Sequence, residues 1–370
     1  MHKSIIKSTV TAENLFGKEK SRDEVINGLK AMPDTYSAFL ELTEEMQEQA
    51  VSFLMGKRSV EILYDNFFRK IFNPEIHQER VERLISALIG EKVRIKQILS
   101  RKGSQLTERG SMVIMDIIVE LEDGSFVDVE IQKIGYRFPS QRSSCYVSDM
   151  IMRQYSRRKS ETKDKGREFD YSTITPVNLF VLMEKSPSDF RSSKAYIHRR
   201  KTSYDSGIRL PETANITYIT LDSFKETVEN ISSDLEAWLT FLIRDDMESV
   251  IRLVDTYPEF GEIYSEIAEF RRDPKELIGM FSEALYIMDK NTERHMIRDL
   301  QEEVDLERQR ADEEKQRADN AEKQAKDEKL RADSAEKRAD SAEQSEKYAR
   351  HQLDGANAII AKYKARFGEL

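Results

Sequence analysis

The chain has 370 residues, enough for one large domain or two smaller ones with a buried core. Charged residues make up 34% of it and apolar residues 39%, a ratio that predicts a globular part joined to a segment built mainly of charge. The net charge of −9 excludes a protein that coats nucleic acid over its whole surface, but it allows a local basic cleft. The single cysteine, Cys145, excludes an intrachain disulfide framework and a multi-cysteine zinc site, and we expect it to pack against a sheet.

Targeting and membrane signals are absent from the sequence. The N-terminus has no apolar core of signal-peptide length, and no stretch approaches about 18 uncharged apolar residues. We therefore expect a soluble, cytoplasmic protein with no membrane segment.

The first elements in chain order are helical. Residues 1–58 predict a helical extension, in which Met46, Ala50, Phe53 and Leu54 lie near helical spacing and Gly56 is a C-terminal stop. Two further helical patterns follow over 60–74 and 75–90, and the second is closed by Gly90.

The period then changes from helical to alternating. Alternating or continuous apolar patterns predict strands within 92–100, 111–124, 125–133, 175–184, 194–203 and 215–224, and a helix within 139–160. The segment "EDG" at 122–124 is a hairpin turn signal. These elements predict an α/β core, a mixed sheet flanked by helices, over 59–228. Helical patterns without any strand signal follow over 229–296.

The last segment, 297–370, repeats every seven residues. Alanine recurs at this interval from Ala311 to Ala339, and the frame extends to Ile297 on one side and to Phe367 on the other. A sustained heptad predicts a coiled coil. Alanine buries little apolar area and glutamates interrupt the seam, so a long single helix or a marginal homo-oligomer is favoured over a tight zipper. A disordered charged tail is the alternative.

The strand pattern "FVDVEIQK" at 126–133 places Asp128, Glu130 and Gln132 on one face. With a turn near Gly124, Asp116 on the preceding strand can come to lie near Glu130. Two carboxylates at that distance suit Mg²⁺, which prefers oxygen ligands and keeps several waters. The alternative is a sheet face that is simply solvated.

Two basic clusters accompany this acidic stripe. Residues 191–204 include Arg199, Arg200 and Lys201 and no acidic residue, and residues 137–159 add six further cations. In a chain of net negative charge, these clusters predict a phosphate-backbone partner. A solvated basic face is the alternative.

The order of elements resembles that of the PD-(D/E)xK nuclease superfamily, and more closely its bacterial branch of PD-(D/E)xK nuclease family transposases, related to the recombination-promoting nucleases. The stretches that carry the resemblance are "YDNFFRKIF", "MDIIVELEDGSFVDVEIQK", "FPSQRSSCYVSDM", "YSTITPVNLFVLME" and "ITYITLDSFK". The resemblance implies a restriction-endonuclease-like fold from about 60 to 300. The usual proline before the first acid is replaced by Met115.

The resemblance also implies residue roles. Asp116 and Glu130 would hold Mg²⁺ or Mn²⁺, and Gln132, at the position of the family lysine, would orient the attacking water as an E-x-Q variant. Arg142 and Tyr146 match the family's "R-x-x-x-Y" pattern, and Arg142 would grip a phosphate. An additional acid from a preceding helix is expected, with Glu82 and Asp65 as candidates beside Glu79 and Glu91; an exposed helix face is the alternative for Glu79 and Glu82.

The sequence thus predicts a metal-dependent DNA endonuclease associated with recombination or transposition. Asp116, Glu130 and Gln132 are its expected catalytic residues, and Arg142, Tyr146, Arg199, Arg200 and Lys201 its expected DNA-binding residues. The alternative is a catalytically inactive nuclease-fold scaffold that acts as an interaction protein through the tail.

Overall fold

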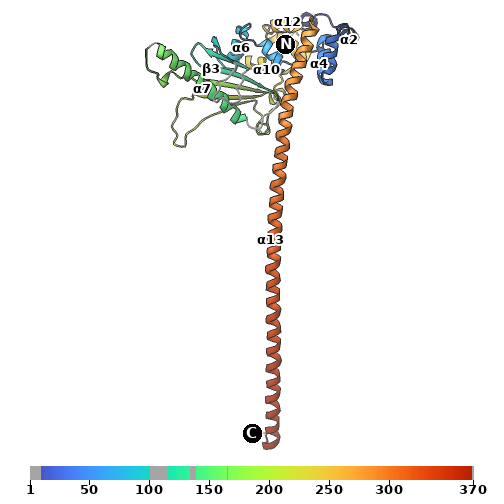
Figure 1. Cartoon of the computed structure of the whole chain (residues 1–370), viewed down its shortest axis with the longest axis vertical. Coiled ribbons are helices and arrows are strands. Elements are labelled where there is room, and N and C mark those ends of the chain that lie inside the picture. Colours follow the sequence, from blue (N-terminus) through green and yellow to red (C-terminus); the bar gives the residue numbers. More distant parts are fainter. Residues whose placement is uncertain (1–9, 101–115, 134–138, 165, 369–370) are drawn as a thin grey trace, which may run out of the picture. The chain divides into compact units, whose positions relative to one another are not determined.

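The computed structural model describes residues 10–100, 116–133, 139–164 and 166–368, without the side chains of residues 65, 285–307, 309 and 367. It divides into two compact units, Met1–Met288 and Asp289–Leu370 (Figure 1). The predicted subdivision at residues 58, 228 and 296 stays a prediction. No helix within the described ranges is long and apolar enough to cross a membrane.

The first unit begins with helices, as predicted. These are α1 (Ala12–Phe16), α2 (Arg22–Lys30), α3 (Pro33–Glu41), α4 (Glu44–Met55), α5 (Asp65–Ile71) and α6 (Gln78–Ile89). Local chemistry sets their ends: Ser21 and Glu24 form a reciprocal capping box before α2. Gly56 and Gly90 end α4 and α6 in the left-handed conformation, where a side chain would be strained.

A six-stranded mixed sheet follows, in the order β1-β2-β3-β4-β6-β5. Its strands are β1 (Ile95–Ile98), β2 (Ile117–Leu121), β3 (Phe126–Gln132), β4 (Val177–Met183), β5 (Ile197–Arg199) and β6 (Ala214–Thr220). Strands β3, β4 and β6 are parallel, and the remaining pairs are antiparallel. The predicted mixed sheet is confirmed. The segment 194–203 yields only the three residues of β5, and the predicted strand stretch 111–115 lies outside the described residues.

The hairpin between β2 and β3 turns where "EDG" predicted it. Gly124 has φ +86, and the Asp123 carboxylate accepts hydrogen bonds from the backbone N–H and the hydroxyl of Ser125. Only glycine adopts this backbone conformation without strain. The turn thereby fixes which residues of β2 and β3 face each other.

Helices cover both faces of the sheet (Figure 1). One face, with Val127 and Val129, belongs to the main core together with α4, α5, α6 and the later helices. Those later helices are α9 (Leu221–Thr227), α10 (Asp234–Ile243), α11 (Met247–Thr256), α12 (Phe260–Glu269) and the start of α13 (Pro274–Phe367). The other face packs against α7 (Pro139–Asp164), which contributes Tyr146 and Met150. The short elements α8 (Ser188–Arg191) and η1 (Tyr171–Thr173) lie in connecting segments.

The expectation for Cys145 is wrong. Cys145 is exposed, because α7 turns a different side toward the sheet, the one that carries Tyr146, Val147 and Met150.

The second unit contains the part of α13 that follows Met288 and continues to Phe367. A long C-terminal helix is therefore confirmed, and the disordered alternative is wrong for the described part. Every described side chain from 308 to 366 is exposed, so the coiled coil itself stays a prediction.

Candidate active site

Asp116 and Glu130 face each other across the β2–β3 hairpin. The ladder pairs Ile117 with Val129, which sets the preceding residue, Asp116, opposite Glu130. The Asp116 backbone N–H donates to Glu130 Oε1 over 3.0 Å, and the Ile131 N–H donates to Asp116 Oδ2 over 2.9 Å. Each carboxylate is thus anchored to the neighbouring strand by a backbone N–H group.

The acidic stripe of β3 is buried rather than solvated. Asp128, Glu130 and Gln132 are 0%, 2% and 3% exposed and lie on the face covered by α7. The solvated-face alternative is therefore wrong. Neither carboxylate oxygen of Asp128, nor Oε1 of Gln132, finds a hydrogen-bond donor among the described residues. Buried oxygens without donors cost free energy, so these atoms favour a cation at this place.

Burial also changes the acidity of the stripe. Burial raises the pKa of Glu130 to about 8, and the negative charge of Asp116 adds to the shift. Hydrogen bonds from the Asp116 N–H and the Tyr146 hydroxyl act in the opposite direction. Burial, followed by the charges of Glu130 and Asp116, raises the pKa of Asp128 well above its ordinary value. A positive charge beside these groups would favour their ionised forms.

These oxygens fit a hard divalent cation. Within the described ranges, no group of three or more His, Cys, Asp and Glu side chains is arranged to hold a metal ion. Mg²⁺ needs only one or two carboxylates, because waters and substrate phosphate complete its shell. Asp116 and Glu130 would supply two carboxylates to such an ion, and Gln132 Oε1 would supply a neutral oxygen.

A cavity of about 540 Å³ opens beside Asp116. It is lined by α5 residues, including Asn66, Arg69 and Lys70, and by Asn73 and Glu276. Arg69 NH2 lies 3.6 Å from Asp116 Oδ1. Arg69 could not be recognised as a site residue from the sequence, because nothing in the spacing of "YDNFFRKIF" relates it to a residue 47 positions later. A larger cavity of about 830 Å³, lined by Glu79, Glu82 and Glu91 among others, contains none of the acid pair.

Arg142 and Tyr146 lie next to Glu130 rather than on an open surface. Arg142 NH2 donates to the Tyr146 hydroxyl over 2.6 Å, and this hydroxyl in turn hydrogen-bonds Glu130. Tyr146 is 4% exposed. Burial and the charge of Glu130 raise the pKa of Tyr146 far above its ordinary value, so its hydroxyl remains a donor.

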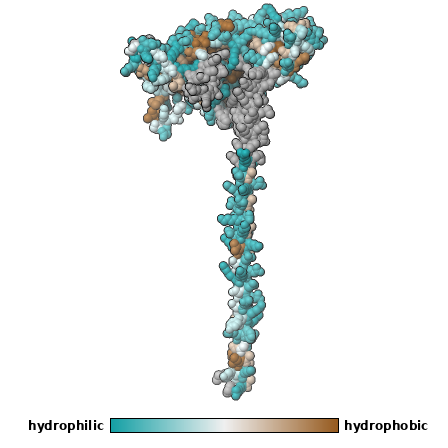
Figure 2. All heavy atoms as spheres, viewed as in Figure 1, coloured by the Kyte–Doolittle hydropathy of each residue, from teal (hydrophilic) through white to brown (hydrophobic). Residues whose placement is uncertain are grey.

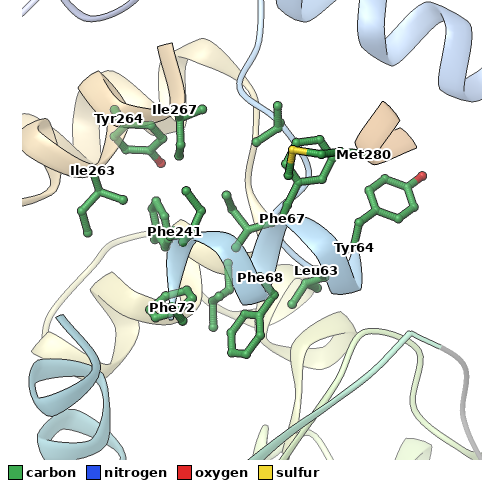
Figure 3. Packing of buried hydrophobic residues seen from close by; sticks show 14 of the residues in the cluster. Leu63, Tyr64, Phe67, Phe68, Phe72, Phe241, Ile263, Tyr264, Ile267 and Met280 are labelled. Carbon is green, nitrogen blue, oxygen red and sulfur yellow. The ribbon is translucent and has the colours of Figure 1, made fainter. Parts of the chain in front are cut away.

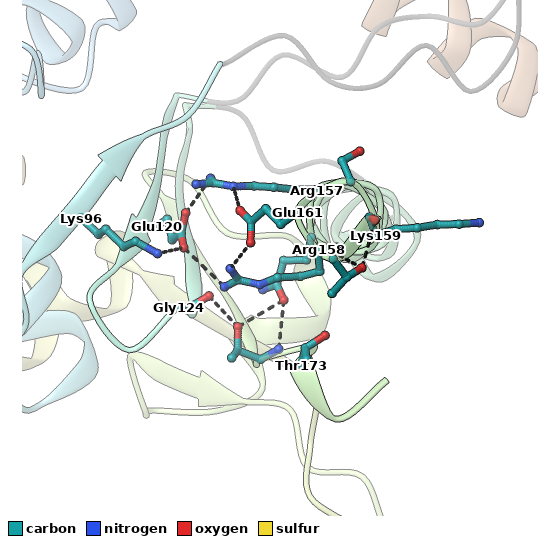
Figure 4. A network of polar contacts seen from close by, with 12 residues as sticks. Lys96, Glu120, Gly124, Arg157, Arg158, Lys159, Glu161 and Thr173 are labelled. Carbon is teal, nitrogen blue, oxygen red and sulfur yellow. Dashed lines mark hydrogen bonds and ion pairs between the residues drawn. The ribbon is translucent and has the colours of Figure 1, made fainter. Parts of the chain in front are cut away.

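Most other cations of the 137–159 cluster contact acids of the protein itself. The fully buried Glu120 of β2 accepts hydrogen bonds from Lys96 at 2.8 Å and from Arg158 at 3.4 Å, and it forms an ion pair with Arg157 at 2.6 Å (Figure 4). Glu161 bridges the same two arginines. Arg153 binds Asp149 at 2.6 Å. Arg137 lies outside the described residues.

The second basic cluster is not assembled with the acid pair. Arg199 pairs with Thr217 of β6, Thr217 pairs with Phe180 of β4, and Phe180 pairs with Val129 of β3. Paired residues point to the same face of a sheet, so Arg199 lies on the face opposite Glu130. Arg200 and Lys201 are exposed near this edge of the sheet, and Arg200 donates to the Ala214 carbonyl over 3.0 Å.

The candidate helix acids are not brought to Asp116 either. Glu82 is 8% exposed, and its Oε1 accepts from the Ile95 N–H over 2.9 Å. Ile95 pairs with Leu121, at the end of β2 that is remote from Asp116. Glu82 therefore binds the first backbone N–H of β1 and does not contribute to the acid pair. Asp65 begins α5, but its side chain lies outside the described residues.

Comparison with known proteins agrees with this geometry. The model of the PD-(D/E)XK nuclease family transposases matches residues 62–296. The chain belongs to this family. No curated protein and no solved structure matches the chain significantly. The matched range of the PD-(D/E)XK nuclease family transposases includes the whole sheet, α7 and both carboxylates of the acid pair.

Proposed function

We propose that the chain is a divalent-metal-dependent DNA endonuclease of the E-x-Q type that hydrolyses phosphodiester bonds during recombination or transposition. The observation that carries the proposal is the pairing of Asp116, which lines an open cavity, with Glu130, each carboxylate held by a backbone N–H. Family membership supports the class of reaction.

Asp116 and Glu130 would hold Mg²⁺ or Mn²⁺, with Gln132 Oε1 near by. Such an ion lowers the pKa of a bound water and neutralises charge on a phosphodiester. Gln132 cannot carry charge, but its amide accepts a hydrogen bond from the attacking water and orients it. Tyr146 fixes the Glu130 carboxylate through its hydroxyl, and Arg142 fixes Tyr146.

DNA cleavage tests the proposal directly. Purified protein should nick supercoiled plasmid in Mg²⁺ or Mn²⁺ and lose this activity in EDTA, with recovery when the ion is restored. Agarose gels report the conversion of supercoiled to open-circular plasmid. A well-folded protein that cleaves neither plasmid nor single-stranded DNA with either ion would contradict the proposal.

The scaffold alternative is the second candidate function, and the exposed tail favours it. The described part of the tail is a long, largely hydrophilic helix (Figure 2), a suitable element for binding a partner. Against it stands the buried acidic stripe. The carboxylates of Asp116, Asp128 and Glu130 repel one another when ionised, which destabilises the folded state. An inactive scaffold would have no functional reason to retain them.

We also propose that the tail forms a weak parallel dimer with a second copy of the chain. Its last heptads place Leu353, Ile360 and Tyr363 on one seam, and these side chains are 62%, 52% and 65% exposed in the single chain. In a parallel, in-register pair, Arg317, Arg331 and Arg338 of one copy would face Glu322, Glu336 and Glu343 of the other. One unfavourable pair, Arg310 with Lys315, opposes these three. An antiparallel pair would set the arginine rows against each other.

Sedimentation equilibrium tests the dimer. At concentrations of tens of micromolar, we expect a mass approaching twice 43.1 kDa. The double variant Leu353→Glu, Ile360→Glu should be monomeric, because two charges enter the seam of each helix. Leu330→Glu is the matched control, since Leu330 is equally exposed but lies outside the seam. A wild-type protein that stays monomeric at these concentrations would exclude the dimer.

A further inference from the structure

The acid pair lacks the strand-borne cation that the PD-(D/E)xK pattern places two residues after the glutamate. Gln132 occupies that position and is neutral. The next residue, Lys133, does not replace it. Its Nζ lies 2.7 Å from Glu61 Oε1 and 3.4 Å from Glu184 Oε2, and it lies 3.4 Å from the centre of the Tyr64 ring. Lys133 therefore neutralises a different pair of acids.

Arg69 of α5 forms an ion pair with the acid pair from an element outside the sheet. Its NH2 lies 3.6 Å from Asp116 Oδ1, and both residues line the 540 Å³ cavity. This distance exceeds the 2.7–2.9 Å of a charge-assisted hydrogen bond, so the contact is mainly electrostatic. About a third of the Arg69 side chain is exposed, whereas the Asp116 side chain is 11% exposed. A ligand in the cavity could therefore reach the guanidinium.

The segment that carries Arg69 is packed into the main core. The flanking residues Phe67, Phe68 and Phe72 are at most 1% exposed and pack against the later helices (Figure 3). Phe67 stacks edge-on against Phe281 at 5.4 Å, and Phe72 against Phe241 at 6.1 Å. Charged groups act most effectively on a reaction when their supporting residues leave them little freedom to move.

We propose that Arg69 is a catalytic residue that supplies the positive charge missing at Gln132, by binding a non-bridging oxygen of the scissile phosphate. A planar guanidinium matches the geometry of phosphate oxygens, and it stays charged at every working pH. The other near cations have different contacts: Arg142 binds Tyr146, and Lys70 pairs with Glu276. This inference rests on the proposed nuclease function.

The test compares four variants of the full chain: Arg69→Gln, Arg69→Lys, Arg69→Gln with Gln132→Lys, and the control Arg83→Gln, at an exposed arginine of α6 that does not line this cavity. Single-turnover DNA cleavage and Mn²⁺ affinity, the latter by electron paramagnetic resonance, are measured on each. We expect Arg69→Gln to cleave roughly 10²-fold more slowly. Its Mn²⁺ affinity should stay equal or rise about fivefold, because a positive charge beside a ligand is removed.

Arg69→Lys should recover part of the rate, and Gln132→Lys should recover at least about tenfold in the Arg69→Gln background by restoring a cation. Arg83→Gln should cleave within about threefold of the wild type. Unchanged cleavage by Arg69→Gln overturns the inference. The inference is also overturned if Arg69→Gln loses cleavage, Mn²⁺ affinity and thermal stability together and Gln132→Lys does not restore cleavage. That result would show that Arg69 has a structural role. A wild type that binds Mn²⁺ but cleaves no DNA refutes the nuclease proposal, and this inference with it.

Discussion

Asp116→Asn is expected to lower the cleavage rate by roughly 10³-fold while leaving the fold intact. The variant removes one negative charge from the acid pair but keeps an oxygen that can accept from the Ile131 N–H. A metal ion supplies several kcal/mol of transition-state stabilisation, and each 1.36 kcal/mol is worth about tenfold in rate. Under the proposed function, the loss of one of the two carboxylates that would hold the ion should remove much of this stabilisation. Glu130→Gln should behave in the same way.

The same hairpin provides the matched controls. Asp123→Asn and Glu122→Gln make the same chemical changes at exposed positions near the turn, away from the acid pair. Both should cleave plasmid at close to the wild-type rate in a single-turnover assay. Circular dichroism melting curves establish that every variant is folded. Full cleavage by folded Asp116→Asn would show that the acid pair does not carry the reaction.

Glu120→Ala is expected to destabilise the first unit by about 3 kcal/mol. Glu120 is completely buried and has three cationic partners from β1 and α7 (Figure 4). Removing it leaves these cations without their common anion and loosens α7 from the sheet. Their partial exposure lets water compensate in part, which keeps the loss near the lower end of the range for broken buried ion pairs. Urea unfolding followed by tryptophan fluorescence measures the change.

Glu161→Ala is the control for this network. Glu161 contacts Arg157 and Arg158 too, but its side chain is 38% exposed. Exposed ion pairs contribute little, so its loss should cost less than about 1 kcal/mol. Equal destabilisation by both variants would show that burial of Glu120 is not what makes the network strong. No destabilisation by Glu120→Ala would show that the network does not hold α7.

The parts of the fold that were predictable have local causes. The alternation in 126–133 and the turn at Gly124 specify a hairpin, and the hairpin register then sets Asp116 opposite Glu130. Gly56 and Gly90 mark helix ends through their backbone conformation. These features depend on residues close in sequence, so one sequence suffices to see them.

Features that depend on distant partners could not be predicted. Arg157 and Arg158 look like phosphate ligands in sequence, yet their partner Glu120 is more than 35 residues away. Arg69 lies 47 residues before Asp116, and only the packing of α5 brings them together. The exposure of Cys145 could not be predicted, because the packing of α7 on the sheet decides which side of the helix is buried. The apolar residues of α7 recur too irregularly to indicate that side.

The internal pairing of the α7 arginines has a consequence for how DNA would bind. A protein releases condensed counterions from DNA only for cations that newly neutralise phosphates. Arg153, Arg157 and Arg158 already have carboxylate partners within the chain, so engaging them would require breaking those pairs. Fewer ions would then be released than the number of basic residues suggests. The affinity for duplex DNA would consequently fall only slightly as the salt concentration rises. Contacts with the phosphate at the candidate active site would then supply most of the binding free energy.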